Sequence, residues 1–203
     1  MNEIVIASSN TYKVLQIREM LKELAPKACV LSLFDFPNYK LPQHDPTKSF
    51  QENARIKAQD AAHHLQKCAI AEQWGLVIPA LQEESVELFS NDQNLTHAQL
   101  LVSQTKKILA AMQGKRDFER TAYLESCIVC AHPKGKIREG VGRVEGSITD
   151  GERGKGSFEF DTIFVKHDYM KTLAELSESV RGRISHRRKA LEKLIGFLES
   201  CSI

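Results

Sequence analysis

The chain has 203 residues, 42% of them hydrophobic, which is enough to bury a sizeable core as one domain or as two small lobes. Its formal net charge of +2 argues against a protein built to grip nucleic acid, because such proteins usually carry a large basic surplus or a long basic stripe. The sequence has neither an apolar run of about 18 residues nor a signal-peptide pattern, so we expect a cytoplasmic protein with no membrane partner.

The chain opens with a short apolar strand, Ile4–Ala7, that runs through Ser8, Ser9 and Asn10 into a helix. Ser9 or Asn10 can cap this helix. The unpaired amides and the dipole of a helix N-terminus stabilise an anion, whereas a cation such as Lys13 in the first turn is disfavoured unless a negative group lies beside it. The stretch predicts a phosphate site, and an ordinary capped helix with a solvated lysine is the alternative.

Two further elements follow at regular spacing. Apolar residues recur with helical period from Val14 to Leu24, and a short apolar strand follows at Cys29–Leu33. This order of strand, helix and strand predicts a parallel pair within an α/β sheet. A proline-containing loop then carries Asp45.

A second helix begins at a capping box, Ser49–Glu52, in which the hydroxyl and the carboxylate each satisfy an unpaired amide. Its alanine-rich face allows close packing. Asn53 and Lys57 stand one turn apart on one side of it, although a surface position is the usual one for a lysine.

The next apolar run, Cys68–Ala71, predicts a short strand, with Glu72 and Gln73 directly after its end. Ligands of open α/β sheets bind outside the carboxyl ends of the strands. Glu72 is therefore a candidate site residue by its position.

The remaining elements are predicted from local patterns. In chain order they are a polar loop at Gln82–Asn94, a helix capped by Thr96, an antiparallel pair of strands formed by Thr121–Ala131 and a run ending at Ile148, an aromatic and acidic strand at Phe158–Val165, a short helical segment at Lys171–Leu176, and a last helix capped near Ser185 and extending through Leu198. Cys127 and Cys130 have the spacing of a zinc or redox pair. In a strand, however, residues three apart point to opposite faces, so both are predicted to pack in the core.

Several of these stretches, in matching order and spacing, resemble the inosine triphosphate pyrophosphatase family, which hydrolyses ITP, dITP and XTP to the monophosphate and pyrophosphate. The matching stretches are Ser8–Lys13, Ser49–Ala58, Ile70–Leu76, Ser157–Phe164, Lys171–Leu176 and Ile184–Arg187. The resemblance implies a single α/β domain over residues 1–203, elongated and two-lobed, with a long central mixed sheet flanked by helices. It also implies a nucleotide cleft between the lobes and a homodimer.

The resemblance assigns roles to individual residues. Hydrolysis of a triphosphate requires cations that offset its charge and a base that activates water, and Mg²⁺ prefers carboxylate and phosphate oxygens. The metal ligands would be Asp45 and Glu72, although Asp45 is equally readable as a loop carboxylate before Pro46. The substrate-binding residues would be Ser8, Ser9, Asn10, Lys13, Asn53 and Lys57 in the phosphate region, and Phe158, Asp161, Lys171, Arg181, Ser185, His186 and Arg187 in the region of the base and sugar.

In the base region, Phe158 would stack on the base, and His186 and Arg187 would donate to a 6-oxo group. Donors that suit this carbonyl would face another donor if adenine were bound, and an unpaired buried polar group costs about 1–3 kcal/mol. Core packing is the alternative for Phe158 and Phe160, and we favour it for one of the two.

The catalytic pattern departs from that of the family. Where the family has two aspartates, a serine and a glycine, this chain has Glu72, Gln73, Trp74 and Gly75. Gln73 occupies the position of the family's general base, and an amide cannot accept a proton near neutral pH. Glycines expected near Phe158 are also replaced, one of them by Glu159.

Two functions are therefore carried forward. The first is hydrolysis of deaminated purine triphosphates, impaired by Gln73 or rescued by Glu72 as base, with Lys13 and Lys57 assisting. The second is a catalytically silent protein that binds purine nucleotides. A role in nucleic-acid binding ranks third and would require steep salt dependence.

Overall fold

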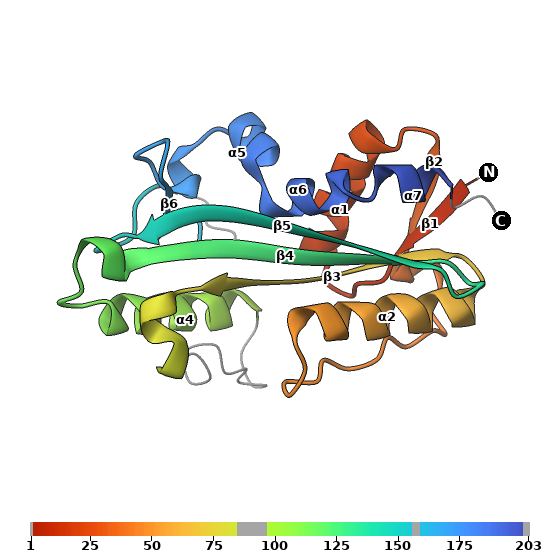
Figure 1. Cartoon of the computed structure of the whole chain (residues 1–203), viewed down its shortest axis with the longest axis horizontal. Coiled ribbons are helices and arrows are strands. Elements are labelled where there is room, and N and C mark those ends of the chain that lie inside the picture. Colours follow the sequence, from red (N-terminus) through yellow and green to blue (C-terminus); the bar gives the residue numbers. More distant parts are fainter. Residues whose placement is uncertain (1, 85–96, 156–158, 201–203) are drawn as a thin grey trace. The chain divides into compact units, whose positions relative to one another are not determined.

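A computed structural model describes residues 2–84, 97–155 and 159–200 (Figure 1). The strands are β1 (Asn2–Ile6), β2 (Ala28–Ser32), β3 (Cys68–Val77), β4 (Thr121–Ala131), β5 (Ile137–Ile148) and β6 (Phe164–Lys166). The α-helices are α1 (Thr11–Leu24), α2 (Phe50–Leu65), α4 (His97–Ala111), α5 (Glu178–Ile184), α6 (His186–Glu192) and α7 (Ile195–Glu199). Short 3₁₀ turns are η1 (Leu33–Asp35), η2 (Pro79–Glu84), η3 (Asp117–Arg120) and η4 (Leu173–Glu175).

The strands form a six-stranded sheet in the order β2-β1-β3-β4-β5-β6. β1 runs parallel to β2 and to β3, and β5 runs antiparallel to β6. β4 and β5 are neighbours joined by a tight turn at residues 132–136, which only antiparallel strands allow. The prediction of an α/β fold with a mixed sheet flanked by helices is confirmed.

The chain divides into two compact units. The first contains Met1–Gly75, Glu125–Arg143 and Ile184–Ile203, and the second contains Leu76–Leu124 and Val144–Arg183. The single domain over residues 1–203 stays a prediction. Among the described residues, no helix combines the length and the apolar character needed to cross a bilayer.

In the first unit, helices cover both faces of the sheet (Figure 1). One apolar cluster joins Ile4 and Ile6 of β1 and Ile70 of β3 to α1, α6 and α7. A second cluster joins Ala69 and Ala71 of β3 to the alanine face of α2. Alternate residues of β3 therefore face α1 and α6 or face α2, as the two-residue period of a strand requires.

The two strand cysteines follow the same alternation. Cys127 packs in the cluster between the sheet and α2, and Cys130 packs in the cluster between the sheet and helices α1 and α6. The prediction that both are core residues on opposite faces is confirmed, which removes the reading of this spacing as a zinc or redox pair.

Strand β3 is longer than its apolar run predicts. The predicted end at Ala71 is wrong, because the strand continues to Val77. Its pairing with β1 stops at Ile70, while the long strand β4 lies on its other side and supports the extension. Glu72 and Gln73 consequently lie inside a strand, with their side chains on opposite faces.

The aromatic and acidic segment of the second unit is also different from its prediction. Residues 159–163 form turns and only Phe164–Lys166 is a strand. Glu159, at a position where the resemblance predicts a glycine, has φ of 65°, a value that favours glycine. Phe160 is buried in the core, while Phe158 lies outside the described residues, as do Thr96 and most of the predicted loop before it.

The last helix is interrupted. The sequence predicts one helix from Ser185 through Leu198, whereas the structure has α6 and α7 separated at Lys193 and Leu194. The amide of Leu194 bonds to the carbonyl of Leu191, three residues earlier, so the turn tightens at this point. The predicted cap at Ser185 is confirmed, because its Oγ accepts from the amides of Arg187 and Arg188.

Gly142→Ala tests the close contact between β5 and α6. An added Cβ would lie 2.0 Å from the backbone oxygen of His186 and 2.6 Å from the nitrogen of Ala190, so α6 would have to move. We expect a loss of about 1–3 kcal/mol in unfolding free energy, measured by urea denaturation. Gly196→Ala is the control, since nothing lies within 4 Å of its added Cβ. Equal losses in both variants would contradict the contact.

Candidate functional site

The loop between β1 and α1 is organised by side-chain caps. Asn10 is the N-cap of α1, and its Oδ1 accepts from the amide of Lys13 at 3.2 Å. The Oγ of Ser8 accepts from the amide of Asn10, also at 3.2 Å, while Ser9 is exposed. Of the two predicted caps, Asn10 is the one the structure uses, because its side chain reaches across one turn.

A carboxylate lies beside the first-turn lysine. Lys13 Nζ is 3.3 Å from Oε2 of Glu72, whose side chain is only 1% exposed. The negative group that offsets the unfavourable position of Lys13 at the helix N-terminus is therefore the side chain of Glu72. A bound anion would share this lysine with Glu72.

Glu72 is the centre of a buried polar cluster. Arg187 Nε donates to its Oε1 at 2.6 Å, and the hydroxyl of Ser126 donates to the same oxygen at 2.9 Å. Burial would raise the pKa of Glu72, but Arg187 and Lys13 outweigh it and lower the pKa to about 2. Glu72 is therefore a carboxylate at neutral pH, with Oε2 accepting no hydrogen bond from the described part of the chain.

Arg187 is held on a second side as well. Its Nη1 donates to Oε1 of Gln16 at 2.9 Å, and Gln16 Nε2 in turn donates to the hydroxyl of Tyr12 at 2.6 Å. With 2% of its side chain exposed, Arg187 is among the largest buried side chains of the protein. Arg187, which is predicted to donate to the purine base, thus forms hydrogen bonds with Glu72 and Gln16 of its own chain.

His186 precedes this arginine and is also buried. Burial, followed by the positive charges of Arg187 and Lys13, lowers the pKa of His186 to about 3. The imidazole is therefore neutral at physiological pH. Its Nε2 has no hydrogen-bond partner among the described residues, which leaves one buried polar atom able to bind a ligand.

Glu72 and Gln73 lie on different faces of β3. Trp74 shares the face of Glu72, and its ring lies 5.1 Å from the guanidinium carbon of Arg187. Gly75 lies on the other face, where an added Cβ would meet the ring of Phe50 of α2 at 2.4 Å. By the same alternation Gln73, which the resemblance places at the position of the general base, faces α2.

Lys57 lies on α2, on the side of the sheet that Gln73 faces. It is half-buried, and burial together with the nearby charge of Lys13 lowers its pKa. In the described ranges no carboxylate forms an ion pair with it. The pKa of His44 is also lowered, by desolvation first and then by Lys57 and Lys13, so several cationic groups share this region.

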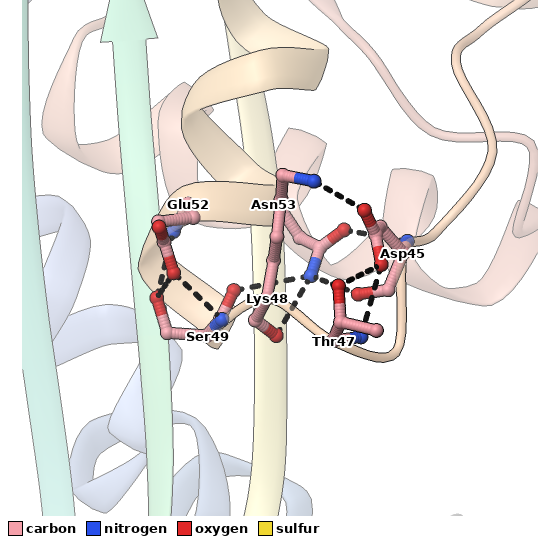
Figure 2. A network of polar contacts seen from close by, with 6 residues as sticks. All are labelled: Asp45, Thr47, Lys48, Ser49, Glu52 and Asn53. Carbon is pink, nitrogen blue, oxygen red and sulfur yellow. Dashed lines mark hydrogen bonds and ion pairs between the residues drawn. The ribbon is translucent and has the colours of Figure 1, made fainter.

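The loop before α2 is a closed network of polar contacts (Figure 2). Asn53 Oδ1 accepts from the amide of Asp45 at 2.8 Å, and its Nδ2 donates to the carbonyls of Asp45, Lys48 and Ser49. The capping box of Ser49 and Glu52 is confirmed. Asn53 is 1% exposed and holds the loop, so its amide is not presented to a ligand.

Asp45 is bound within the same loop. Its carboxylate accepts from the amide and hydroxyl of Thr47, at 2.9 and 2.6 Å, and forms an ion pair with Lys48. These contacts, the one with Lys48 above all, hold the pKa of Asp45 well below its usual range. The alternative reading of Asp45 as a turn carboxylate therefore has direct support.

The second unit holds the remaining described candidates. Arg181 Nη1 lies 3.4 Å from Oδ2 of Asp161, so these two form a pair. Lys171 is exposed beside η4. The structure thus brings Lys13, Glu72, His186 and Arg187 together in one unit and pairs Asp161 with Arg181 in the other.

Residues 4–197 match the model of the Ham1 family. The chain belongs to the Ham1 family. It is 39% identical over 198 residues to the dITP/XTP pyrophosphatase of Protochlamydia amoebophila, covering 98% of each chain. It is 40% identical over 199 residues to that of Chlamydia pneumoniae, covering 98% of this chain and 95% of the relative.

The solved structures agree. The Ham1 protein of Staphylococcus aureus superposes with a TM-score of 0.80 at 30% identity, covering 98% of this chain and 99% of that one. The predicted resemblance to the inosine triphosphate pyrophosphatases is confirmed at the level of the family, since the curated relatives are dITP/XTP pyrophosphatases.

Asp45 and Glu72, the predicted metal ligands of this Ham1 protein, each have their own partners in the structure. Asp45 is tied to α2 through Asn53, whereas Glu72 points toward α1 and α6. In the part of the chain that the structure describes, no three of His, Cys, Asp and Glu gather at one point. In general, Mg²⁺ bound to a triphosphate takes only one or two protein carboxylates, because phosphates and waters complete its shell.

Sequence reasoning missed three contributors to the Ham1 site. Ser126 and Gln16 bind the Glu72 and Arg187 pair from distant parts of the chain, and no local motif marks them. The resemblance gives Trp74 no role beyond replacing the family's serine. Its position two residues after Glu72 would have placed both side chains on one face, had β3 been predicted at its full length.

Proposed function

We propose that the protein hydrolyses deaminated purine nucleoside triphosphates, ITP, dITP and XTP, to the monophosphate and pyrophosphate, at a rate reduced by Gln73. The observation that supports this most strongly is the pair Lys57 and Lys13. Lys57 is half-buried without a described carboxylate partner, and its pKa is lowered by burial first and then by the charge of Lys13, so a triphosphate beside both lysines would offset their positive charge.

The base end of the substrate is proposed to meet His186. Its buried Nε2 lacks a partner among the described residues, and Arg187 is fixed directly beside it. A neutral imidazole can donate to a 6-oxo group through one tautomer, and an adenine amino group would leave that donor unpaired at a cost of about 1–3 kcal/mol. This supports a preference for 6-oxo purine nucleotides, among them those of inosine and xanthosine, over adenine nucleotides.

Magnesium, a homodimer and a cytoplasmic location stay predictions. When bound with the triphosphate, Mg²⁺ would offset phosphate charge, and Asp45 and Glu72 are the residues that would hold it. For Asp45 this requires release of Lys48 from its carboxylate. The roles of Ser8, Ser9, Phe158, Asp161, Lys171, Arg181 and Ser185 toward the substrate are also predictions.

The second candidate is a silent purine-nucleotide-binding protein. It is favoured by one observation, that the side chain facing α2 at the position of the base is the amide of Gln73. Pyrophosphate release from ITP, XTP, dITP, ATP and GTP, with and without Mg²⁺, separates the two. Release from ITP, XTP or dITP supports the hydrolase, and ITP binding without release from any nucleotide supports the binding protein.

Lys57→Ala is expected to weaken ITP binding about tenfold or more, because a charge-assisted contact contributes roughly 1.5–3 kcal/mol. Calorimetry measures the dissociation constant for ITP and for inorganic triphosphate, and both should rise together. Lys22→Ala is the control, since Lys22 is exposed and ion-paired with Glu19 on α1. Unchanged affinity in Lys57→Ala would remove Lys57 from the phosphate site.

A further inference from the structure

Trp74 is the sole tryptophan of the chain, and it contacts both Arg187 and His186. Its ring centroid is 5.1 Å from the guanidinium carbon of Arg187 and 5.8 Å from the centroid of His186, with 43° between the two ring planes. Trp74 is half-buried and belongs to neither of the two apolar clusters described above. Its described ring contacts are with the polar side chains of Arg187 and His186.

The Trp74 ring makes a contact with Arg187 that differs in kind from the hydrogen bonds of this arginine. Glu72 and Gln16 bind Nε and Nη1 of Arg187 in the plane of the guanidinium. Hydrogen bonds of this kind restrain the guanidinium along its N–H directions, whereas the Trp74 ring, over which the guanidinium carbon lies, adds packing and cation–π attraction. Because Trp74 and Glu72 alternate on one face of β3, one strand supplies both restraints.

We propose that Trp74 is a positioning residue that fixes the side chains of Arg187 and His186 and thereby sets the preference of the site for 6-oxo over 6-amino purines. The link to purine choice rests on the proposed function, while the restraint on Arg187 stands without it. A serine at this position would leave the guanidinium and the imidazole without their shared neighbour, and a phenylalanine would keep a ring there.

The restraint is tested first without nucleotide. In ¹H–¹⁵N NMR, the Nε–H of Arg187, assigned by its loss in Arg187→Lys, should exchange slowly because it is buried against Glu72. Trp74→Ser should shift this resonance and speed its exchange about tenfold, and Trp74→Phe should leave it near the wild-type rate. The Nε–H of Arg188, which bonds to Glu192 on the exposed side of α6, is the internal control. An unchanged Arg187 signal in Trp74→Ser overturns the proposal.

The consequence for purine choice is tested by binding. Trp74→Ser should lower the ratio of ITP affinity to ATP affinity about tenfold, which corresponds to about 1.4 kcal/mol, and Trp74→Phe should restore most of it. Affinity for inorganic triphosphate should stay the same in both variants. A ratio that does not change, or a loss that is equal for triphosphate, overturns the role in purine choice. If the wild type binds neither ITP nor triphosphate, the proposed function fails, and the NMR result alone decides the restraint.

Discussion

Gln73→Asp is expected to raise the rate of ITP hydrolysis by about 10²–10⁴, the usual contribution of a general base. Gln73 faces α2, the helix that carries Lys57, so a carboxylate there would join the cationic region proposed for the phosphates. Trp74 points to the opposite face, next to Arg187, and therefore does not obstruct this position. The single substitution should suffice.

Gln73→Asn is the matched control, because it shortens the side chain in the same way without adding a carboxylate. Pyrophosphate release is measured for both variants and for the wild type at one Mg²⁺ concentration. A wild type as fast as Gln73→Asp would show that another group, Glu72 first among them, already acts as base. No hydrolysis by any of the three, with ITP bound by all, would favour the binding protein.

Arg187→Met is expected to cost about 3–5 kcal/mol of unfolding free energy, because it leaves Glu72 charged and buried without its main partner. The double variant Glu72→Leu with Arg187→Met should recover most of this loss, since replacing both members of a buried ion pair by apolar groups is often neutral. Urea denaturation of the two variants measures the difference.

Arg188→Met serves as the control for this prediction. Arg188 lies on the same helix and pairs with Glu23 and Glu192 near the surface, where such pairs contribute about 0–1 kcal/mol. An equal loss of unfolding free energy in Arg187→Met and Arg188→Met would mean that the buried ion pair contributes no more to stability than the surface pairs. A double variant less stable than the single one would mean that Glu72 is stabilised mainly by Lys13 and Ser126.

Local signals in the sequence predicted much of the fold. The caps at Asn10, Ser49 and Ser185 were predictable because each bonds to amides within a few residues along the chain. The strands β4 and β5 were predictable from an apolar run and a glycine-punctuated run on either side of a turn signal. The family resemblance rests on such short stretches, which is why it could be recognised without tertiary information.

The composition of the candidate site was decided by the tertiary structure. Glu72 and Arg187 are 115 residues apart in the chain, and only the packing of α6 against the sheet brings them within 2.6 Å. The end of β3 was misjudged because its extension depends on pairing with β4, a contact that no local pattern contains. That extension places Glu72 and Gln73 on opposite faces of one strand. The sequence by itself determined which side chains are present, and the length of one strand decided which of them face each other.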